Sequence, residues 1–472
     1  MFSFFLSFAL GIVLGWVYKI NVTLAISLSI LSLGLVYSFR KINYQIVFNF
    51  LLIIFFVSLG VTWVLPYTFF KPYLSSDKKR EFILKVTSFP KQQSLRKIFY
   101  ARILKIDNLP ANLNVRVNDY SNSDVDYLNI YRVRGKLKNY RVNNSSYYIL
   151  WLKNNSYIEK LDTNRVDKTL SIINRQLLNF FRQILSDESY RFIASIFLGR
   201  REFIEKEQKN LFMKAGISHL LAISGLHIGL VSAFLFFLLK IMGLKFRVRL
   251  VISTLLLFLY TLIIGSPPST LRATIMYSTF VLSFLLRRKV NLINSLGLAG
   301  LISLFFNPLW IFDIGFQLSF ISVLGIILGF ENFNINLPIS NLISTYIKNI
   351  ILSTIFVTVA IIPITSFYFG RIYILSIFTN LILIPFFTFI LITTFLILIF
   401  SFSPFLLEII AEVIDFSVFL FMKISRLIGG FKLSFISFSM PPMGIFIYYL
   451  ALGGIILSKR VWDRRLSKVK LY

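Results

Sequence analysis

The sequence predicts a polytopic α-helical membrane protein of about 12 transmembrane helices, with a small β-rich, OB-like extracytoplasmic domain inserted after the third helix. Hydrophobic residues make up 56% of the 472-residue chain, and mean hydropathy is +0.75. A soluble core cannot bury that much apolar surface, which excludes a soluble enzyme, a disordered chain and a coiled coil. One long polar interruption, between Lys71 and Lys214, separates two groups of apolar stretches. The chain has no cysteine, so disulfides, thiolate metal sites and cysteine nucleophiles are excluded.

The amino-terminal region, residues 1–66, contains three apolar stretches at Phe2–Val17, Val22–Tyr37 and Ile46–Leu65. A helix needs about 20 apolar residues to cross a bilayer, so the first stretch is rather short. It lacks both a basic leader segment and a small-residue cleavage site. We therefore expect a retained helix and not a removed signal peptide.

The soluble region, residues 67–218, begins with short aromatic and β-branched segments that Asn, Asp, Ser and Pro separate. This pattern predicts a small antiparallel barrel of about five strands. From Ile172 to Met213 the apolar period becomes helical, with charges on one side. That change predicts helices that lie at the membrane surface.

The third region, residues 219–458, is almost wholly apolar, and a basic tail, residues 459–472, follows it. We expect nine spans in this region, near Leu220–Met242, Val248–Ile264, Leu271–Leu286, Leu292–Phe306, Ile314–Phe330, Leu342–Ile362, Ile372–Phe402, Phe405–Phe421 and Met443–Leu457. The Ile372–Phe402 stretch is too long for one straight span and contains Pro385. We expect a broken or strongly tilted helix there.

Basic residues in the short loops predict the orientation in the cytoplasmic membrane. The clusters are Arg40-Lys41, Lys245–Arg249, Arg287–Lys289 and the tail from Lys459. Placing all four inside puts both termini in the cytoplasm and the β-rich domain outside. Lys423, Arg426 and Lys432 fall on the opposite side, so the last two spans fit this rule least well.

The most distinctive polar stretch is Gly216–Gly229, which contains the only two histidines of the chain. Ser224 and His227 are three residues apart and can touch on a helix, where they either serve a pore or merely bond neighbouring helices. Gly225 and Gly229 form a small-residue pair that lets another helix approach closely. A Ser/His hydrolase would need a carboxylate and an oxyanion hole, and zinc would need a third ligand. We therefore predict neither a catalytic nor a metal site.

A second polar cluster surrounds a helix break at Pro267 and Pro268. Arg272 follows about one turn inside the next span. It either extends toward the outer interface or faces a wet cavity, because a charge in hydrocarbon is costly.

A third cluster begins the span after Asn307. Asp313 and Gln317 lie four residues apart on one face, and Asp313 either caps the helix or faces the interior. Gln317 and Ser319 lie deeper, where polar groups indicate an interior pathway. Further breaks are expected at two prolines, Pro363 and Pro385. Together the clusters predict a polar-lined interior.

These motifs carry a family resemblance. GISHLLAISGLHIGL, SPPSTLRATIM, NPLWIFDIGFQLSFISVLGI and IIPITSFYFGRIYILSIFTNLILIPFF resemble successive signatures of the competence domain of ComEC proteins. These proteins are inner-membrane channels that pass incoming single-stranded DNA in natural transformation. The likeness is close from Gly216 to Phe387 and covers the layout alone before that. It implies pore-lining or pore-shaping roles for Ser224, His227, Arg272, Asp313 and Gln317.

The resemblance also has consequences for partners. It implies single-stranded DNA, the lipid bilayer, a DNA receptor protein and a cytoplasmic helicase or ATPase as partners. Many family members carry a metallo-β-lactamase-like nuclease domain after the competence domain, whereas this chain ends at Tyr472 without an H-x-H-x-D-H cluster. We therefore expect no enzymatic activity and no cofactor, and a separate nuclease.

Several interpretations of the sequence remain open. A DNA-uptake channel is favoured by basic residues interleaved with aromatics in the soluble region, which suit single strands; the candidates are Arg132, Arg134, Lys136 and Lys138. The alternatives are an ordinary solvated basic surface, a transporter or flippase of a small or lipidic anion, and a degenerate family member without transport. An intramembrane enzyme that uses Ser224 and His227 is disfavoured.

Overall fold

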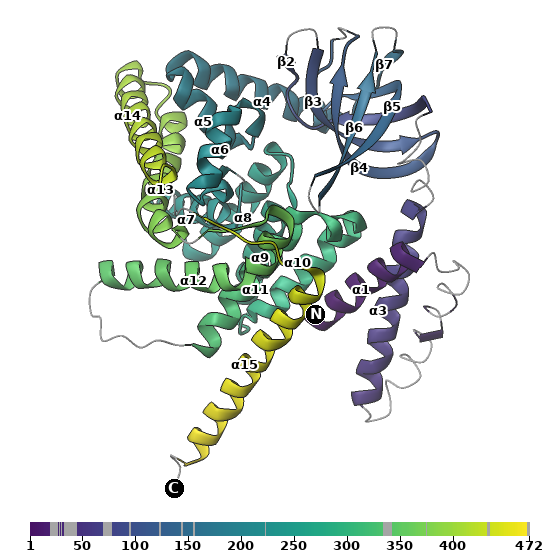
Figure 1. Ribbon diagram of the computed structural model, residues 1–472. Helices are drawn as coiled ribbons and strands as arrows, with labels where there is room; N and C mark the ends of the chain where they lie inside the picture. Colours follow the sequence, from purple (N-terminus) through teal and green to yellow (C-terminus); the bar gives the residue numbers. More distant parts are fainter. Residues whose placement is uncertain are drawn as a thin grey trace.

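A computed structural model describes most of the chain. The described residues are 1–18, 27, 29, 31–32, 45–68, 78–93, 96–121, 124–142, 145–153, 156–221, 223–333, 342–373, 375–431 and 435–469. The second expected span, Val22–Tyr37, lies largely outside these residues. The structure is mostly helical with a β-rich part near the amino terminus, which confirms the broad fold class (Figure 1).

Seven strands form one sheet where about five were expected. They are β1 Arg80–Val86, β2 Lys91–Gln93, β3 Arg96–Ile106, β4 Leu109–Asp119, β5 Ile130–Val142, β6 Ser145–Leu152 and β7 Ile158–Leu161. The order is β1-β3-β4-β6-β5, and β5 also pairs with β1, which closes the sheet on itself. The β4–β6 pair is parallel, and the other pairs are antiparallel. Closure leaves only short edges at β2 and β7.

The period of two along β5 places its side chains alternately inside and outside the barrel. Tyr131, Val133 and Leu137 are buried in the interior, together with aromatic and aliphatic side chains from the other strands. Arg132 and Arg134 therefore point outward. Because the interior is filled by apolar side chains, a charged ligand would bind to the outer surface.

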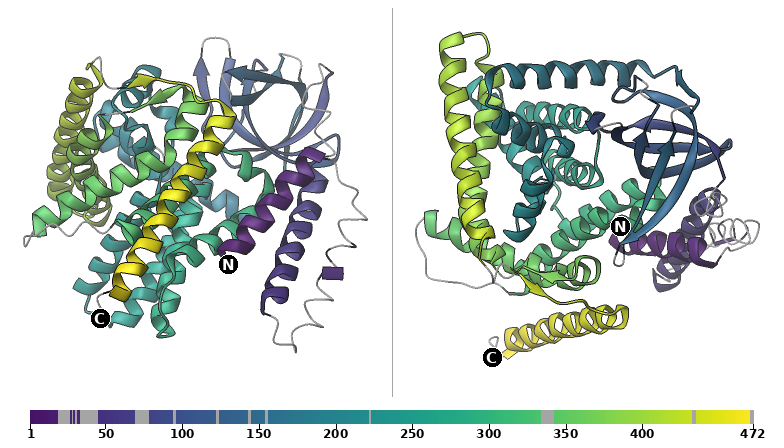
Figure 2. Two further views of the ribbon diagram at one scale, coloured as in Figure 1. Left: turned by 60° about the horizontal axis from the view of Figure 1, so that its bottom comes forward. Right: turned by 45° about the horizontal axis from the view of Figure 1, so that its top comes forward.

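Three amphipathic helices follow the barrel: α4 Arg165–Ile184, α5 Asp187–Leu198 and α6 Lys206–Lys214, with a short turn, η2 Arg201–Phe203, between the last two. Asn164 caps α4, since its side chain accepts the Val166 N–H. The chain leaves α5 through Gly199, whose φ of 73° favours glycine. Figures 1 and 2 show α4 running from the barrel across to α13 and α14.

The remaining helices form the membrane part. They are α1 Phe2–Tyr18, α3 Gln45–Thr68, α7 Gly225–Ile241, α8 Phe246–Ile263, α9 Pro268–Leu285, α10 Leu292–Phe306, α11 Ile314–Asn332, α12 Leu342–Phe369, α13 Ser376–Ile399, α14 Pro404–Gly429 and α15 Pro442–Val469. Five are long and apolar enough to cross a membrane: α8, α11, α12, α13 and α15. Four apolar stretches are shorter: Phe2–Val17 of α1, Asn49–Leu65 of α3, α7 and α10. The chain is therefore a membrane protein, and twelve spans remain a prediction.

The expected breaks at Pro363 and Pro385 are absent, because α12 and α13 continue through these residues. Proline has no N–H, so Pro363 leaves the carbonyl of Val359 without its usual partner one turn earlier. The hydroxyl of Tyr448, on α15, donates a hydrogen bond of 2.9 Å to that carbonyl. A neighbouring helix thus supplies the missing donor and allows α12 to continue.

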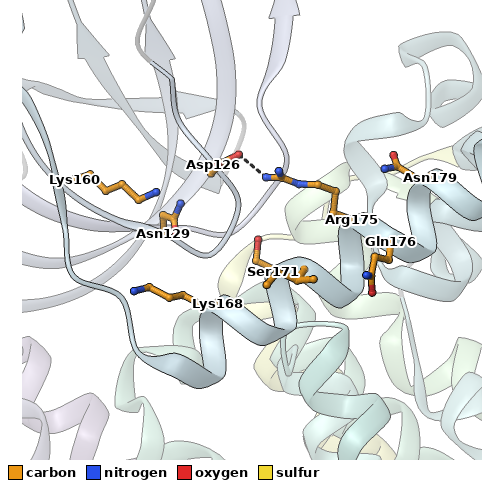
Figure 3. Close-up of a pocket in the computed structure, with 9 residues that line it drawn as sticks. Asp126, Asn129, Lys160, Lys168, Ser171, Arg175, Gln176 and Asn179 are labelled. Atoms are coloured by element: carbon orange, nitrogen blue, oxygen red, sulfur yellow. Dashed lines mark hydrogen bonds and ion pairs between the residues drawn. The ribbon is translucent and has the colours of Figure 1, made fainter.

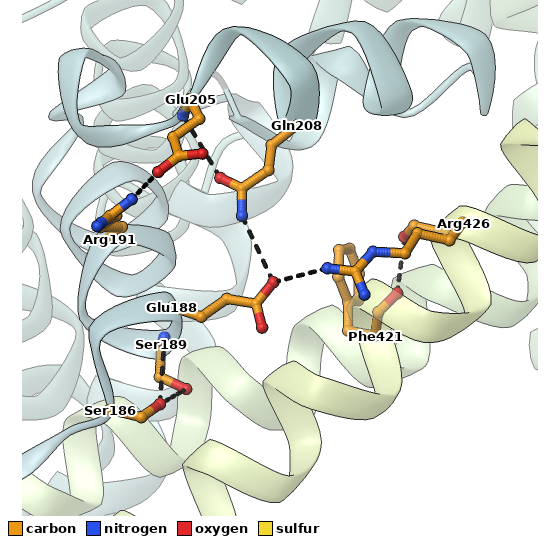
Figure 4. Close-up of polar contacts among 9 residues, drawn as sticks. Ser186, Glu188, Ser189, Arg191, Glu205, Gln208, Phe421 and Arg426 are labelled. Carbon is orange, nitrogen blue, oxygen red and sulfur yellow. Dashed lines mark hydrogen bonds and ion pairs between the residues drawn. The ribbon is translucent and has the colours of Figure 1, made fainter.

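The expected span Phe405–Phe421 remains a prediction. It belongs to α14, which carries charges along its length and is not among the described helices apolar enough to span. Asp415 accepts the Ser186 N–H at 3.1 Å. Arg426 forms a 3.2 Å ion pair with Glu188 of α5 (Figure 4). These bonds attach α14 to the start of α5 and give Arg426 an ion-pair partner there. The expected tail boundary at residue 459 falls inside α15.

Candidate functional site

The polar stretch around Ser224 forms the start of α7. Ser224 is the N-cap, and its N–H donates to Nδ1 of His227 at 3.1 Å, with the Ser224 hydroxyl also 3.1 Å from this nitrogen. His227 is fully buried, and its ring packs edge-on against Phe387 with centroids 4.6 Å apart. Nε2 lies beside the backbone of Leu220 without a hydrogen bond of normal geometry. The predicted contact therefore exists, and its geometry is that of a helix cap.

Arg272 lies where α7, α9 and α11 meet. Its side chain is 3% exposed, and Nη1 donates to the carbonyl of Ser319 at 2.9 Å. Its guanidinium carbon lies 5.7 Å from the ring centroid of Phe320. A Cβ at Gly225 would lie 3.1 Å from Nη2, so this glycine permits the close approach. No described carboxylate forms an ion pair with Arg272. The guanidinium is thus a buried charge that only neutral groups surround.

The start of α9, which follows the helix break at Pro267 and Pro268, is hydrogen-bonded to the loop before α7. The α8 helix ends at Ile263 and α9 begins at Pro268, and the hydroxyl of Ser269 donates to the Ile223 carbonyl at 2.8 Å. Gly229, in contrast, has no atom within 4 Å of its missing Cβ. The helix-packing role predicted for the glycine pair is therefore observed at Gly225 and absent at Gly229.

The third polar cluster caps α11. Asp313 is the N-cap, and its carboxylate accepts the Phe316 N–H at 2.8 Å while the side chain stays exposed. Gln317 donates through Nε2 to the Ile311 carbonyl at 2.9 Å. Asp313 and Gln317 therefore fix the turn between η4 (Pro308–Phe312) and α11, and Ser319 offers its carbonyl to Arg272. The carboxylate of Asp313 remains accessible to a ligand.

Two exposed residues near these helix ends, Arg201 and His219, are not among the site residues predicted from the sequence. Arg201, in η2, is exposed, yet burial lowers its pKa despite the nearby charges of Asp313 and Glu202. His219, in the turn η3 Ser218–Leu221, is also exposed, and burial lowers its pKa to about 4. The signal in the sequence was the charge run after Gly199, which resembles any surface turn.

The predicted basic residues of β5 lie on the outside of the barrel, though not in equal environments. Arg132 forms 3.2 Å ion pairs with both Glu81 and Glu159. Lys136 stands opposite Trp151 in the β5–β6 register. The exposed positions are Arg134 and Lys138, and Trp151 stacks on Tyr120 with ring centroids 6.2 Å apart. The outer surface of β5 and β6 thus combines cations with aromatic rings, as predicted.

A cleft of about 450 Å³ separates the barrel from α4 (Figure 3). Lys160, Lys168 and Arg175 line it, and the Arg175–Asp126 ion pair of 2.8 Å bridges its two sides. Lys168 is paired with Asp162 at 3.1 Å. These pairs neutralise much of the positive charge at the cleft. Among the residues that the structure describes, including those of this cleft, no group of three His, Asp or Glu side chains could hold a metal ion.

Comparisons with known proteins identify relatives of the helical part. A family model described as "Competence protein" matches residues 196–462. ComE operon protein 3 of Bacillus subtilis (strain 168) is 33% identical over 162 residues, which cover 34% of this chain and 21% of that protein. An uncharacterized protein of Aquifex aeolicus (strain VF5) is 33% identical over 159 residues, which cover 33% of this chain and 38% of that protein. The alignments thus span well under half of each relative, and no solved structure matches.

Proposed function

We propose, since this chain belongs to the competence protein family, that it carries single-stranded DNA across the cytoplasmic membrane during natural transformation. The family match covers the apolar helices α7 to α14 and most of α15. The observation that carries the proposal is the group Arg201, His219 and Asp313 near the helix ends, whose side chains are all exposed. A polyanion needs a path that offers water and positive charge, because charges in hydrocarbon are costly, and Arg201 supplies such a charge.

The barrel supports a receiving role in the same proposal. Its closed strand order with one parallel pair is consistent with an OB-like fold, and such folds often bind single strands on their outer surface. Arg134, Lys136 and Lys138 would hold phosphates while Trp151 stacks on a base. The barrel would then lie outside the cytoplasm, with both chain termini inside. A DNA receptor, a cytoplasmic helicase or ATPase and a separate nuclease would act with it.

A second candidate, transport of a small or lipidic anion, is favoured by one observation. Arg272 is buried without a described carboxylate partner, and such a charge could act as the counter-ion of an anionic cargo. DNA transport requires binding of a polymer with a steep dependence on salt, whereas a small-anion carrier does not.

Deletion of the gene in the host, with complementation by the full chain, tests the proposal. Fluorescent DNA should still bind the surface of the deletion strain, while protection of that DNA inside the cytoplasm should disappear and then be restored by the chain. Undiminished cytoplasmic DNA in the deletion strain would overturn the proposal.

A further inference from the structure

Two consecutive arginines stand at the start of η2, and they differ in exposure: Arg200 is the N-cap of this turn and Arg201 is its first residue. Arg200 is 3% exposed, and its Nη2 donates to the Tyr127 hydroxyl at 2.6 Å and to Oδ1 of Asn174 at 2.7 Å. Its guanidinium also lies 4.0 Å from the centroid of the Tyr127 ring. Arg201 is exposed and forms no ion pair with any described residue. Arg200 therefore holds the barrel to α4, and Arg201 is left available to a ligand.

A hydrogen bond places the edge of the barrel directly on this turn. The Phe89 N–H donates to Oε1 of Glu202 at 2.9 Å. Phe89 precedes β2, whose three residues, beginning with Lys91, are all exposed. Lys91 and Arg201 thus lie on the two sides of the Phe89–Glu202 bond, one on the barrel and one on the helical part.

Lys209, on α6, joins the same group of cations. Burial lowers its pKa, and the positive charges of Lys91 and Arg201 lower it further, against the opposing charge of Glu202. Glu202 already accepts the Phe89 N–H and lies beside Arg200, so it cannot pair fully with each cation. None of these three cations has an ion pair in the described part of the chain. Like charges held together repel, so an anion with several charges would bind favourably across them.

We propose that Lys91, Arg201 and Lys209 form a phosphate track that passes the backbone of single-stranded DNA from the barrel toward the exposed helix ends at Asp313 and His219. The inference rests on the proposed function and names residues outside both the β5 surface and the polar helix ends. Arg201 is within electrostatic range of Asp313, at the start of α11, and of His227, in α7. The track therefore connects the outer edge β2 to the ends of the membrane helices.

The test is DNA binding by the full chain in detergent micelles, with a fluorescent 20-mer of deoxythymidine as the probe. The slope of log affinity against log salt becomes shallower by about 0.7 for each phosphate of a single strand that the protein no longer neutralises. The triple variant Lys91→Gln, Arg201→Gln, Lys209→Gln should therefore have a slope that is shallower by about 2. A conservative variant, Lys91→Arg, Arg201→Lys, Lys209→Arg, should keep the slope, which excludes misfolding as the cause.

A matched control removes the same charge from three exposed cations elsewhere, Lys105→Gln, Arg165→Gln and Lys245→Gln. Its slope should stay within about 0.5 of the wild-type value, because these side chains lie outside the track. An unchanged slope in the track variant, or equal changes in both variants, would overturn the track alone. A wild-type chain that fails to bind the probe would overturn the proposed function as well.

Discussion

Removal of the Arg200 side chain should release the barrel from the helical part of the protein. Hydrogen bonds to charged groups contribute about 1.5–3 kcal/mol each, and Arg200 makes two, to Tyr127 and Asn174, so Arg200→Met should weaken the junction by about 3–5 kcal/mol. Because 1.4 kcal/mol corresponds to a factor of ten, the open fraction should rise about 100-fold or more. Amide hydrogen exchange in peptides that contain Phe89 and Tyr127 measures this opening in the full chain.

The neighbouring arginine provides the control. Arg201→Met removes the same charge and a similar volume from a side chain without a described ion pair, so exchange at the junction should change by a factor of about 2 or less, as at ordinary surface positions. Equal acceleration by the two variants would refute the assignment of Arg200 to the junction. Unchanged amide exchange in both peptides of the Arg200→Met variant would also refute this assignment.

Three further predictions concern the membrane helices and the orientation. Gly225→Ala should lower the amount of folded protein, because its Cβ would lie 3.1 Å from the buried Arg272 guanidinium. Gly229→Ala should be neutral or stabilise the protein by up to about 1 kcal/mol, since nothing lies within 4 Å of its Cβ position. Quantitative immunoblotting measures the amount of each variant. Tyr448→Phe should destabilise by about 1–3 kcal/mol in a detergent unfolding assay, since a carbonyl in α12 is left without its donor; an unchanged midpoint would contradict this. Ser121→Cys in the barrel should react with a membrane-impermeant thiol reagent in intact cells, and labelling only after lysis would reverse the orientation.

Local sequence signals determined the best-predicted elements. The stretch Leu292–Phe306 was predicted with the bounds that α10 has, because the side chain of Asn291 caps its start and that of Asn307 begins the next turn. The β-rich region followed from alternation and turn residues. Ser224 and His227, three residues apart, also make the contact that their spacing predicts.

The errors come from partners that are distant in sequence. Pro363 does not break α12, since its orphaned carbonyl finds a hydroxyl on α15. Arg426, which fits the loop-charge rule poorly, pairs with Glu188, which lies 238 residues earlier. Arg200 and Arg201 are adjacent and chemically identical, yet one is buried and the other is exposed. Only the tertiary structure, which brings Tyr127 and Asn174 to one of them, distinguishes the two.

The most direct test of DNA transport is to capture a strand inside the protein. A photo-crosslinking amino acid at His219 should form an adduct with a fluorescent single strand whose trailing end is blocked by bound streptavidin, so that transport stalls. The same amino acid at Leu259, an exposed apolar position on α8, is the control. We expect a DNA adduct at position 219 and none at 259. Absence of an adduct at 219, or equal adducts at both positions, would contradict a path for DNA past His219.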